Sequence, residues 1–262
     1  MAWATSSSTP QEKHEVFLSF RGEDTRYTFT GHLHATLTRL QIKTYIDYNL
    51  QRGDEISSSL LRAIEDAKLS VVVFSKNYGN SKWCLDELVK ILECKRTKGQ
   101  IILPIFYDID PSHVRNQTGS YAEAFVKHER LFKGNLDKVQ KWRAALREAA
   151  NYSGWDCSVN RMESEVVEKI AKDVLEKLNR VYVGDLDQQI AKLEQLAQLQ
   201  YQFFQTIPTI QNCQNHQATV ERINELKMER SVRMLRLSPD MLSHLGNSST
   251  KNSFGFSSSF DM

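Results

Sequence analysis

The hydrophobic positions in the first two thirds of the chain form short continuous runs that alternate with longer segments of helical spacing. The strand candidates are residues 16–20, 43–47, 69–74, 101–107 and a last short strand with a turn at 153–156. The helix candidates are residues 25–40, 56–67, 84–96, 121–132, 136–150 and 163–178. Alternating strands and helices predict an α/β fold, with an open, mostly parallel sheet of about five strands and helices on both faces.

Residues within these segments sharpen the expected arrangement. The run at 69–74 is almost entirely apolar and rich in β-branched residues, which is typical of a central parallel strand buried on both faces. Pro104 cannot donate a ladder hydrogen bond, so its strand is expected near an edge of the sheet or with a local irregularity. Asp24 or Thr25 is placed to cap the first helix, and residues 108–120 are expected to form a loop.

The C-terminal part of the chain has a different composition. Residues 188–204 are helix-prone and rich in glutamine, and residues 220–237 are helix-prone and rich in arginine and glutamate. The remaining residues are rich in serine, asparagine and glycine, which predicts disorder. The expected organisation is a disordered leader at 1–11, one domain at 12–178, a linker and helix-prone appendage at 179–237, and a disordered tail at 238–262.

Charge and cysteine content exclude several classes of protein. Among 262 residues, 34 lysines and arginines nearly balance 32 aspartates and glutamates, so we expect no membrane partner and no sequence-specific nucleic acid partner. The sequence contains no run of about 20 apolar residues, so it predicts no membrane-spanning helix. The four cysteines, none in a C-x-x-C pair, indicate a reducing compartment, either cytoplasm or nucleus, and no zinc site; they are Cys84, Cys94, Cys157 and Cys213.

The stretch from Ser75 to Leu88 carries the main candidate for a working site. It leaves the strand at 69–74, crosses a polar loop and enters a helix. Trp83 and Glu87 are one helical turn apart, so an aromatic ring and a carboxylate are expected on the same side of the first turns. Ligands bind such sheets at the carboxyl ends of the strands. The alternative is a core aromatic residue and a solvated helix carboxylate.

Two other groups of residues can be weighed as reactive or metal-binding. Cys84 has no histidine at an informative spacing, and Leu85 and Leu88 surround it with apolar character, so a buried structural thiol is favoured over a nucleophile. His32 and His34 stand two residues apart on a predicted helix, where such residues do not share a face. We therefore expect no metal site there.

Four separated blocks of the sequence resemble one known family. In order, the blocks are residues 17–26, 52–56, 75–78 with 81–88, and 103–107 with 110–115. Over roughly residues 12–178 they resemble the plant Toll/interleukin-1 receptor (TIR) domain of disease-resistance proteins, which implies a flavodoxin-like fold. No G-x-x-x-x-G-K-[ST] loop and no leucine-rich repeat period follows. We therefore expect a truncated, TIR-only member with an unrelated tail.

The resemblance implies an enzyme, an NAD+ glycohydrolase with Glu87 as its catalytic glutamate. NAD+ is then the substrate, and no cofactor is held permanently. Cleaving the bond from ribose to nicotinamide builds positive charge on the sugar, which a neighbouring carboxylate stabilises. Nicotinamide leaves as a neutral molecule from a cationic precursor, so no general acid is needed. One carboxylate can therefore suffice.

The resemblance also assigns roles to other residues. The expected substrate contacts are Phe20, Arg21, Gly22, Ser81 and Trp83, with Trp83 stacking on a ring of the substrate. The segment 48–55 resembles the mobile BB loop of the family, for which the expected residues are Asp47, Arg52, Gly53 and Asp54. The interface candidates are His32, Gly154 and Trp155. The alternatives are an ordinary surface loop for the BB segment and core packing for Gly154 and Trp155.

Two functions follow from the resemblance, and they differ in class. In the first, self-association through TIR–TIR contacts assembles an NAD+-consuming enzyme for plant innate immune signalling and cell death, and its nucleotide products reach lipase-like immune helper proteins. In the second, the domain is a non-catalytic adaptor that pairs with full-length TIR-type resistance receptors. A phosphate-accepting receiver domain is disfavoured, because the strand at 69–74 is followed by Ser75 and no aspartate.

Overall fold

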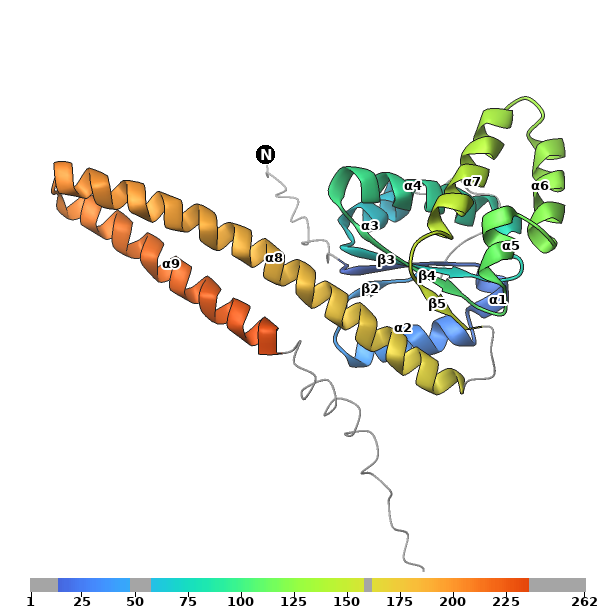
Figure 1. Ribbon diagram of the computed structural model, residues 1–262, viewed down its shortest axis with the longest axis horizontal. Helices are drawn as coiled ribbons and strands as arrows, with labels where there is room; N and C mark the ends of the chain where they lie inside the picture. Colours follow the sequence, from blue (N-terminus) through green and yellow to red (C-terminus); the bar gives the residue numbers. More distant parts are fainter. Residues whose placement is uncertain (1–13, 48–57, 158–161, 236–262) are drawn as a thin grey trace, which may run out of the picture. The chain divides into compact units, whose positions relative to one another are not determined.

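The computed structural model describes residues 14–47, 58–157 and 162–235. Five strands form one parallel sheet in the order β2-β1-β3-β4-β5 (Figure 1). The strands are β1 (Val16–Phe20), β2 (Thr44–Tyr45), β3 (Leu69–Phe74), β4 (Ile101–Phe106) and β5 (Trp155–Asp156). The predicted α/β fold with a five-stranded parallel sheet is confirmed.

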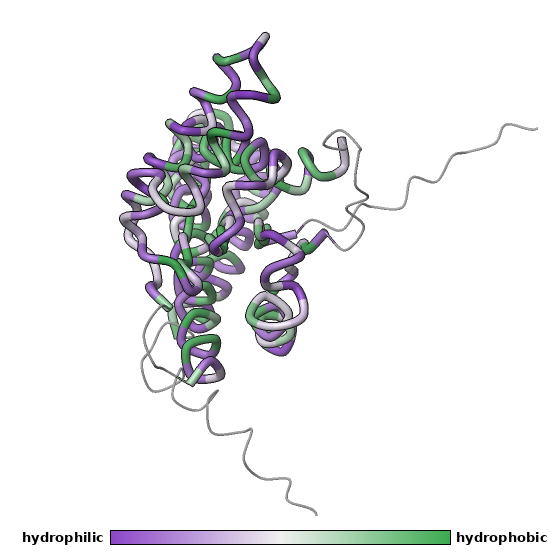
Figure 2. Tube along the Cα trace, turned by 90° about the vertical axis from the view of Figure 1, so that its right-hand side faces the viewer, coloured by the Kyte–Doolittle hydropathy of each residue, from purple (hydrophilic) through white to green (hydrophobic). Residues whose placement is uncertain are grey.

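Helices connect the strands and continue beyond them. They are α1 (Gly22–Thr25), α2 (Phe29–Arg39), α3 (Ser58–Asp66), the 3-10 helix η1 (Tyr78–Asn80), α4 (Lys82–Lys98), α5 (Pro111–Asn116), α6 (Ser120–Leu131), α7 (Leu136–Ala149), α8 (Glu163–Thr206) and α9 (Ile210–Leu235). Figure 2 shows hydrophobic and hydrophilic residues alternating along the helices, as expected where only one face of a helix is buried.

The sheet separates two hydrophobic layers. Successive side chains of a strand point to opposite faces, and Phe17, Val72 and Phe74 pack with α3, α4 and α7 in one core cluster. Figure 1 shows α3 and α4 on one face of the sheet and α2 on the other. The buried residues of α2 include Phe29, Leu33 and Leu37, which do not belong to that cluster. Helices therefore cover both faces, as predicted.

The chain divides into two compact units, residues 1–175 and 176–262. In the second unit, the part of α8 that begins at Glu176 pairs with α9. The buried residues of this pair are Leu186, Ile190, Ala197, Ile223 and Leu226. Helix α8 runs without a break to Thr206, so the prediction that a helix ends at Leu178 is wrong. Apolar residues at helical spacing and the absence of proline from 163 to 206 explain the continuation. The domain boundary at 178 stays a prediction.

The expected cap of the first helix is also wrong. The segment is split into α1 and α2, and the carboxylate of Asp24 accepts hydrogen bonds from Ser75 Oγ at 2.5 Å and from the backbone N–H of Asn77 at 3.1 Å. Thr25 Oγ1 lies 2.8 Å from Thr30 Oγ1. Asp24 therefore ties the end of β1 to the end of β3, a long-range role that a local cap pattern cannot reveal.

The loop expected at 108–120 contains a short helix, α5. Asp110 accepts a hydrogen bond from the backbone N–H of Ser112 at 2.7 Å, and Pro111 occupies the first turn. This is the arrangement that favours a helix start. The expected strand at 43–47 shortens to Thr44–Tyr45.

Pro104 lies near the edge of the sheet, as predicted. It pairs with Val72 of β3, whereas the edge strand β5 pairs with β4 only at Ile105 and Phe106. A missing ladder donor is tolerated next to so short an edge strand.

We predict that Gly154→Ala destabilises the protein. A Cβ atom added at Gly154 would lie 2.1 Å from the carbonyl oxygen of Pro104, so β5 would have to move away from β4. Overpacking of this kind costs about 1–3 kcal/mol. Urea unfolding should show this loss, whereas the control Gly134→Ala, whose added Cβ meets no atom within 4 Å, should be at least as stable as the wild type. Equal unfolding free energies of the two variants would contradict the prediction.

Candidate active site

Glu87 is a buried carboxyl one turn into α4. Ser81 caps the start of the helix: its hydroxyl accepts a hydrogen bond from the backbone N–H of Cys84 at 3.3 Å. Glu87 is only 3% exposed, and the hydroxyl of Ser19 on β1 lies 2.7 Å from its Oε2. Helix α4 therefore carries an acidic side chain inward, against the central part of the sheet.

The surroundings of Glu87 favour the neutral carboxylic acid. Burial raises the pKa of Glu87 to about 8, the negative charges of Asp47 and Asp86 act in the same direction, and the hydrogen bond from Ser19 opposes them. The carboxyl therefore changes its charge near physiological pH. A strongly shifted pKa of this kind is common in catalytic acids and bases, although structural networks also produce it.

Cys84, three residues before Glu87, is a packing residue. It is buried, and its thiol donates a hydrogen bond to the carbonyl oxygen of Phe20 at 3.4 Å. Burial raises the pKa of the Cys84 thiol far above its usual range, so the reactive thiolate is not populated. The structure thus agrees with the preference for a structural thiol.

Four of the five predicted substrate contacts lie around one hollow of about 850 Å³. Those four are Arg21, Gly22, Ser81 and Trp83, and the other described lining residues are Glu23, Arg26, Tyr27, Asn80, Lys82, His128, Leu131 and Phe132. Phe20 is not among the described lining residues; it is 5% exposed, with the guanidinium of Arg26 5.4 Å from its ring centroid.

Glu87 is also not among the described residues that line the hollow. Trp83 and Glu87 are one turn apart as predicted, but Trp83 lines the hollow while Glu87 is buried beside Ser19. That the two side chains lie on the same side of the helix and form one working site stays a prediction.

The hollow combines positive charge with aromatic rings. Its lining cations are Arg21, Arg26 and Lys82, and its lining aromatic residues include Trp83 and Phe132. Arg21 pairs with Glu23 and lies 3.5 Å from Asp24, which partly offsets its charge. Guanidinium and ammonium groups bind phosphate, and aromatic faces stack on planar rings. The hollow therefore suits an anionic ligand that carries a ring.

Sequence reasoning missed several of these residues. Ser19 is the one polar residue in the buried strand VFLSF, and that interruption of an apolar run was a usable signal. His128 contacts the hollow from α6, and its Nε2 donates to the carbonyl oxygen of Gly79 at 2.9 Å. Burial lowers the pKa of His128, which favours the neutral ring. Nothing local in the sequence distinguishes His128 from a surface residue of an amphipathic helix.

The predicted interface residues have partners within the chain. His32 Nδ1 lies 2.7 Å from Glu163 Oε1, and Trp155 Nε1 donates to Asp173 Oδ2 at 2.9 Å. Gly154 is exposed. Their roles in an interface stay predictions.

Of the four predicted BB-loop residues, the structure describes only one. Asp47 is half-buried, and its carbonyl oxygen accepts a hydrogen bond from Arg26 Nη1 at 2.8 Å. Arg52, Gly53 and Asp54 lie outside the described residues.

Other site types find little support in the part of the chain that the structure describes. Its histidine, cysteine, aspartate and glutamate side chains include no group of three that could hold a metal ion. No helix within residues 14–47, 58–157 and 162–235 is long and apolar enough to cross a membrane.

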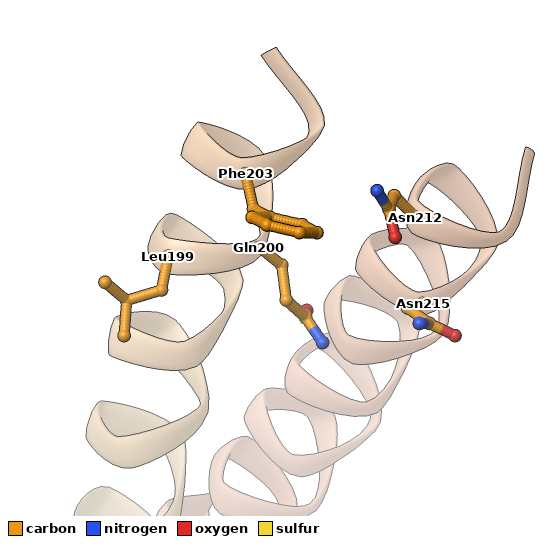
Figure 3. A pocket seen from close by; sticks show the side chains of 5 residues that line it. All are labelled: Leu199, Gln200, Phe203, Asn212 and Asn215. Carbon is orange, nitrogen blue, oxygen red and sulfur yellow. The ribbon is translucent and has the colours of Figure 1, made fainter. Parts of the chain in front are cut away.

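A second hollow, of about 460 Å³, lies between α8 and α9. Figure 3 shows Gln200 and Phe203 of α8 on one side and Asn212 and Asn215 of α9 on the other; Leu199 completes the lining. These amide and apolar side chains supply no acid, base or nucleophile.

Comparison with known proteins identifies the family. A model of the TIR domain matches residues 13–198. The chain is 51% identical over 187 residues to disease resistance protein RPV1 of Vitis rotundifolia, and 44% identical over 203 residues to TMV resistance protein N of Nicotiana glutinosa. These matches cover 69% and 75% of this chain but only 13% and 18% of the relatives, so the chain spans less than a fifth of their length.

One solved structure is similar in both sequence and fold. It contains the TIR domains of the activated Roq1 resistosome, which directly recognises the pathogen effector XopQ. The sequence identity is 51% and the TM-score is 0.58, with 61% of this chain and 98% of that chain covered.

We predict that Glu87→Gln changes the pH dependence of stability. The folded-state pKa of Glu87 lies above that of the unfolded chain, so the folded protein binds this proton more tightly. The stabilisation from this proton is complete below about pH 4.5 and is lost as the pH rises through about 8. At pH 8 the variant should therefore be more stable than the wild type by about 2–5 kcal/mol, and the difference should shrink toward acid pH.

Urea unfolding across this pH range measures the difference. Glu93→Gln, which replaces an exposed glutamate on the same helix, is the control and should follow the wild-type curve. A constant offset between Glu87→Gln and the wild type at every pH would show that Glu87 does not titrate in this range.

Proposed function

This chain belongs to the TIR domain family, and we propose that it is an NAD+ glycohydrolase with Glu87 as its catalytic glutamate. The observation that carries the proposal is a buried carboxyl at the start of α4, with a pKa raised to about 8, one turn from a hollow lined by cations and aromatic rings. The alternative of a solvated helix carboxylate does not fit a side chain that is 3% exposed.

One carboxylate is enough for this reaction. As the bond between the ribose and nicotinamide breaks, positive charge develops on the sugar, and an ionised Glu87 beside it stabilises that charge. Low solvent access strengthens the interaction, because the effective dielectric constant is small near a buried group. The departing nicotinamide is neutral, so the site needs no second acid.

The lining of the hollow supports the proposal that it binds a dinucleotide. Its guanidinium and ammonium groups, from Arg21, Arg26 and Lys82, suit the two phosphates, and Trp83 offers a face for a planar ring. NAD+ is consumed in the reaction, so it is a substrate and not a resident cofactor.

The family relationships support a role in plant immunity. The similar proteins named above are disease resistance proteins, and the similar structure is an activated resistosome. We infer that this domain associates through TIR–TIR contacts, with copies of itself or with TIR-type resistance receptors, in the cytoplasm or nucleus. Its nucleotide products then reach lipase-like immune helper proteins and lead to cell death.

An NAD+ consumption assay tests the enzymatic function. Purified protein, at high concentration or fused to an oligomerising tag, should consume NAD+, and Glu87→Ala should reduce the rate at least about 100-fold if its electrostatic contribution is typical. Glu93→Ala on the same helix should keep the wild-type rate. Equal background rates for the wild type and Glu87→Ala, with and without forced assembly, would exclude the activity.

The second function, a non-catalytic adaptor, is favoured by one observation. Glu87 is nearly inaccessible and is not among the described lining residues of the hollow, whereas His32 is exposed on α2. A non-catalytic adaptor needs the exposed surface around His32 for contacts with other TIR domains, but it does not need the carboxyl group of Glu87.

A cell-death assay in plant leaves separates the two functions. For an adaptor, Glu87→Ala should keep the response and His32→Ala should lose it. Because His32 pairs with Glu163, the matched control is Glu163→Gln, which weakens the same pair but keeps the imidazole. Loss of the response in Glu87→Ala, at equal protein level and with intact self-association, would exclude the adaptor.

A further inference from the structure

Glu87 stands at one end of a chain of buried oxygen atoms. Its Oε2 lies 2.7 Å from Ser19 Oγ, Ser19 Oγ lies 2.9 Å from the hydroxyl oxygen of Tyr78, and that hydroxyl lies 2.9 Å from the carbonyl oxygen of Cys84. Ser19 and Tyr78 are both fully buried. The three contacts all have the length of ordinary hydrogen bonds, so each requires one hydrogen atom.

Counting hydrogen atoms shows which form of Glu87 fits this geometry. The hydroxyls of Ser19 and Tyr78 supply two hydrogens, and the carbonyl oxygen of Cys84 can only accept. The third hydrogen must come from the carboxyl group of Glu87. With a neutral Glu87, the carboxyl donates to Ser19, Ser19 donates to Tyr78, and Tyr78 donates to Cys84, so every contact is a hydrogen bond.

An ionised Glu87 leaves one contact without a hydrogen. If Ser19 donates to the carboxylate and Tyr78 donates to Ser19, the carbonyl oxygen of Cys84 loses its bond to Tyr78. If Tyr78 keeps its bond to Cys84, the oxygens of Ser19 and Tyr78 face each other without a hydrogen. Either arrangement has fewer bonds than the neutral one, and an unmade buried hydrogen bond is costly.

We propose that Ser19 and Tyr78 are positioning residues, whose hydroxyls form a directed hydrogen-bond chain that holds Glu87 as a neutral acid in the resting protein. Ionisation reverses the chain: the proton of Glu87 leaves to solvent, the Ser19 hydrogen turns toward Glu87, and the Tyr78 hydrogen turns toward Ser19. The catalytic meaning of this switch rests on the proposed function, because an ionised Glu87 is the form that stabilises a cationic sugar.

The other groups around Glu87 do not oppose the neutral form. The described titratable groups that act with it are Tyr45 and Asp47 at the end of β2, Tyr78 of η1, and Cys84 and Asp86 of α4. Asp47 and Asp86 disfavour a further negative charge. Burial raises the pKa of Tyr78 well above its usual range, so its hydroxyl stays protonated. Tyr78 is also fixed by an edge contact to Phe74, with ring centroids 5.0 Å apart.

Tyr78→Phe tests the direction of the chain. It removes the acceptor that draws the Ser19 hydrogen away from Glu87, so Ser19 can donate to the ionised carboxylate without leaving another contact unmade, and the pKa of Glu87 should fall. One hydrogen bond corresponds to about one pH unit. In a Ser19→Ala background the connecting hydroxyl is absent, so adding Tyr78→Phe should leave the pKa of Glu87 unchanged. An effect of Tyr78→Phe that depends on Ser19 distinguishes the chain from a merely structural contact.

The measurement is a pH titration of the Glu87 carboxyl carbon by NMR, in full-length protein labelled with 13C at glutamate side chains and assigned with Glu87→Gln. Tyr121→Phe is the matched control: it deletes an equally buried hydroxyl, which donates to the carbonyl oxygen of Ser75 at 2.9 Å outside the chain, and should leave the midpoint unchanged. If Ser19→Ala does not fold, Ser19→Cys keeps a similar volume with a weaker donor, and the effect of Tyr78→Phe on the midpoint should shrink in that background.

A fall of the Glu87 midpoint in Tyr78→Phe that disappears in the Ser19→Ala background supports the proposal; a rise, no shift, or a fall that persists without Ser19 overturns it. The acid limb of the kcat/KM profile for NAD+ should move with the NMR midpoints. If no variant consumes NAD+ but the Tyr78→Phe midpoint still falls, the proposed function fails and the hydrogen-bond chain stands. The two failures are therefore distinguishable.

Discussion

Burial of the Glu87 carboxyl is the physical constraint on which the site depends. A carboxylate loses much solvation when it is removed from water, and the described charges that act on Glu87, Asp47 and Asp86, are themselves negative. The side chain is therefore tolerated as a neutral acid, and its hydrogen bond to Ser19 satisfies one oxygen. Burial of this ionisable group lowers the free energy of unfolding at neutral pH, and it places the group where little solvent reaches it.

The parallel sheet makes this position possible. Strands β1 and β3 are neighbours in register, so Ser19 and the segment that follows β3 meet at one edge. Asp24 binds Ser75 and Asn77, which fixes that segment to the end of β1. This contact holds the segment that leads to Tyr78 close to the strand that carries Ser19.

Local patterns were enough to predict the scaffold. The apolar runs and helical spacing that gave five strands and the helices between them depend on near neighbours in the sequence, and Pro104 even indicated the edge. The side-chain partners that the sequence did not predict depend on distant contacts. Asp24 has the composition of a helix cap but bonds to a residue 51 positions away. Ser19 reaches Glu87 across 68 positions, and no spacing rule connects them.

Distant contacts also explain why the family resemblance pointed to Glu87 but not to its protonation state. The resemblance supplied the residue, while the protonation state follows from burial and from the number of hydrogens available to three oxygen contacts. A neutral, buried carboxyl ionises more readily when a positive charge comes close. In a site of low dielectric constant, a cationic nicotinamide ring near Glu87 favours the ionised form far more than it would in water. Under the proposed function, the substrate itself lowers the cost of ionising Glu87. Resting protein then holds a neutral acid, and the carboxylate appears when the positively charged ring arrives.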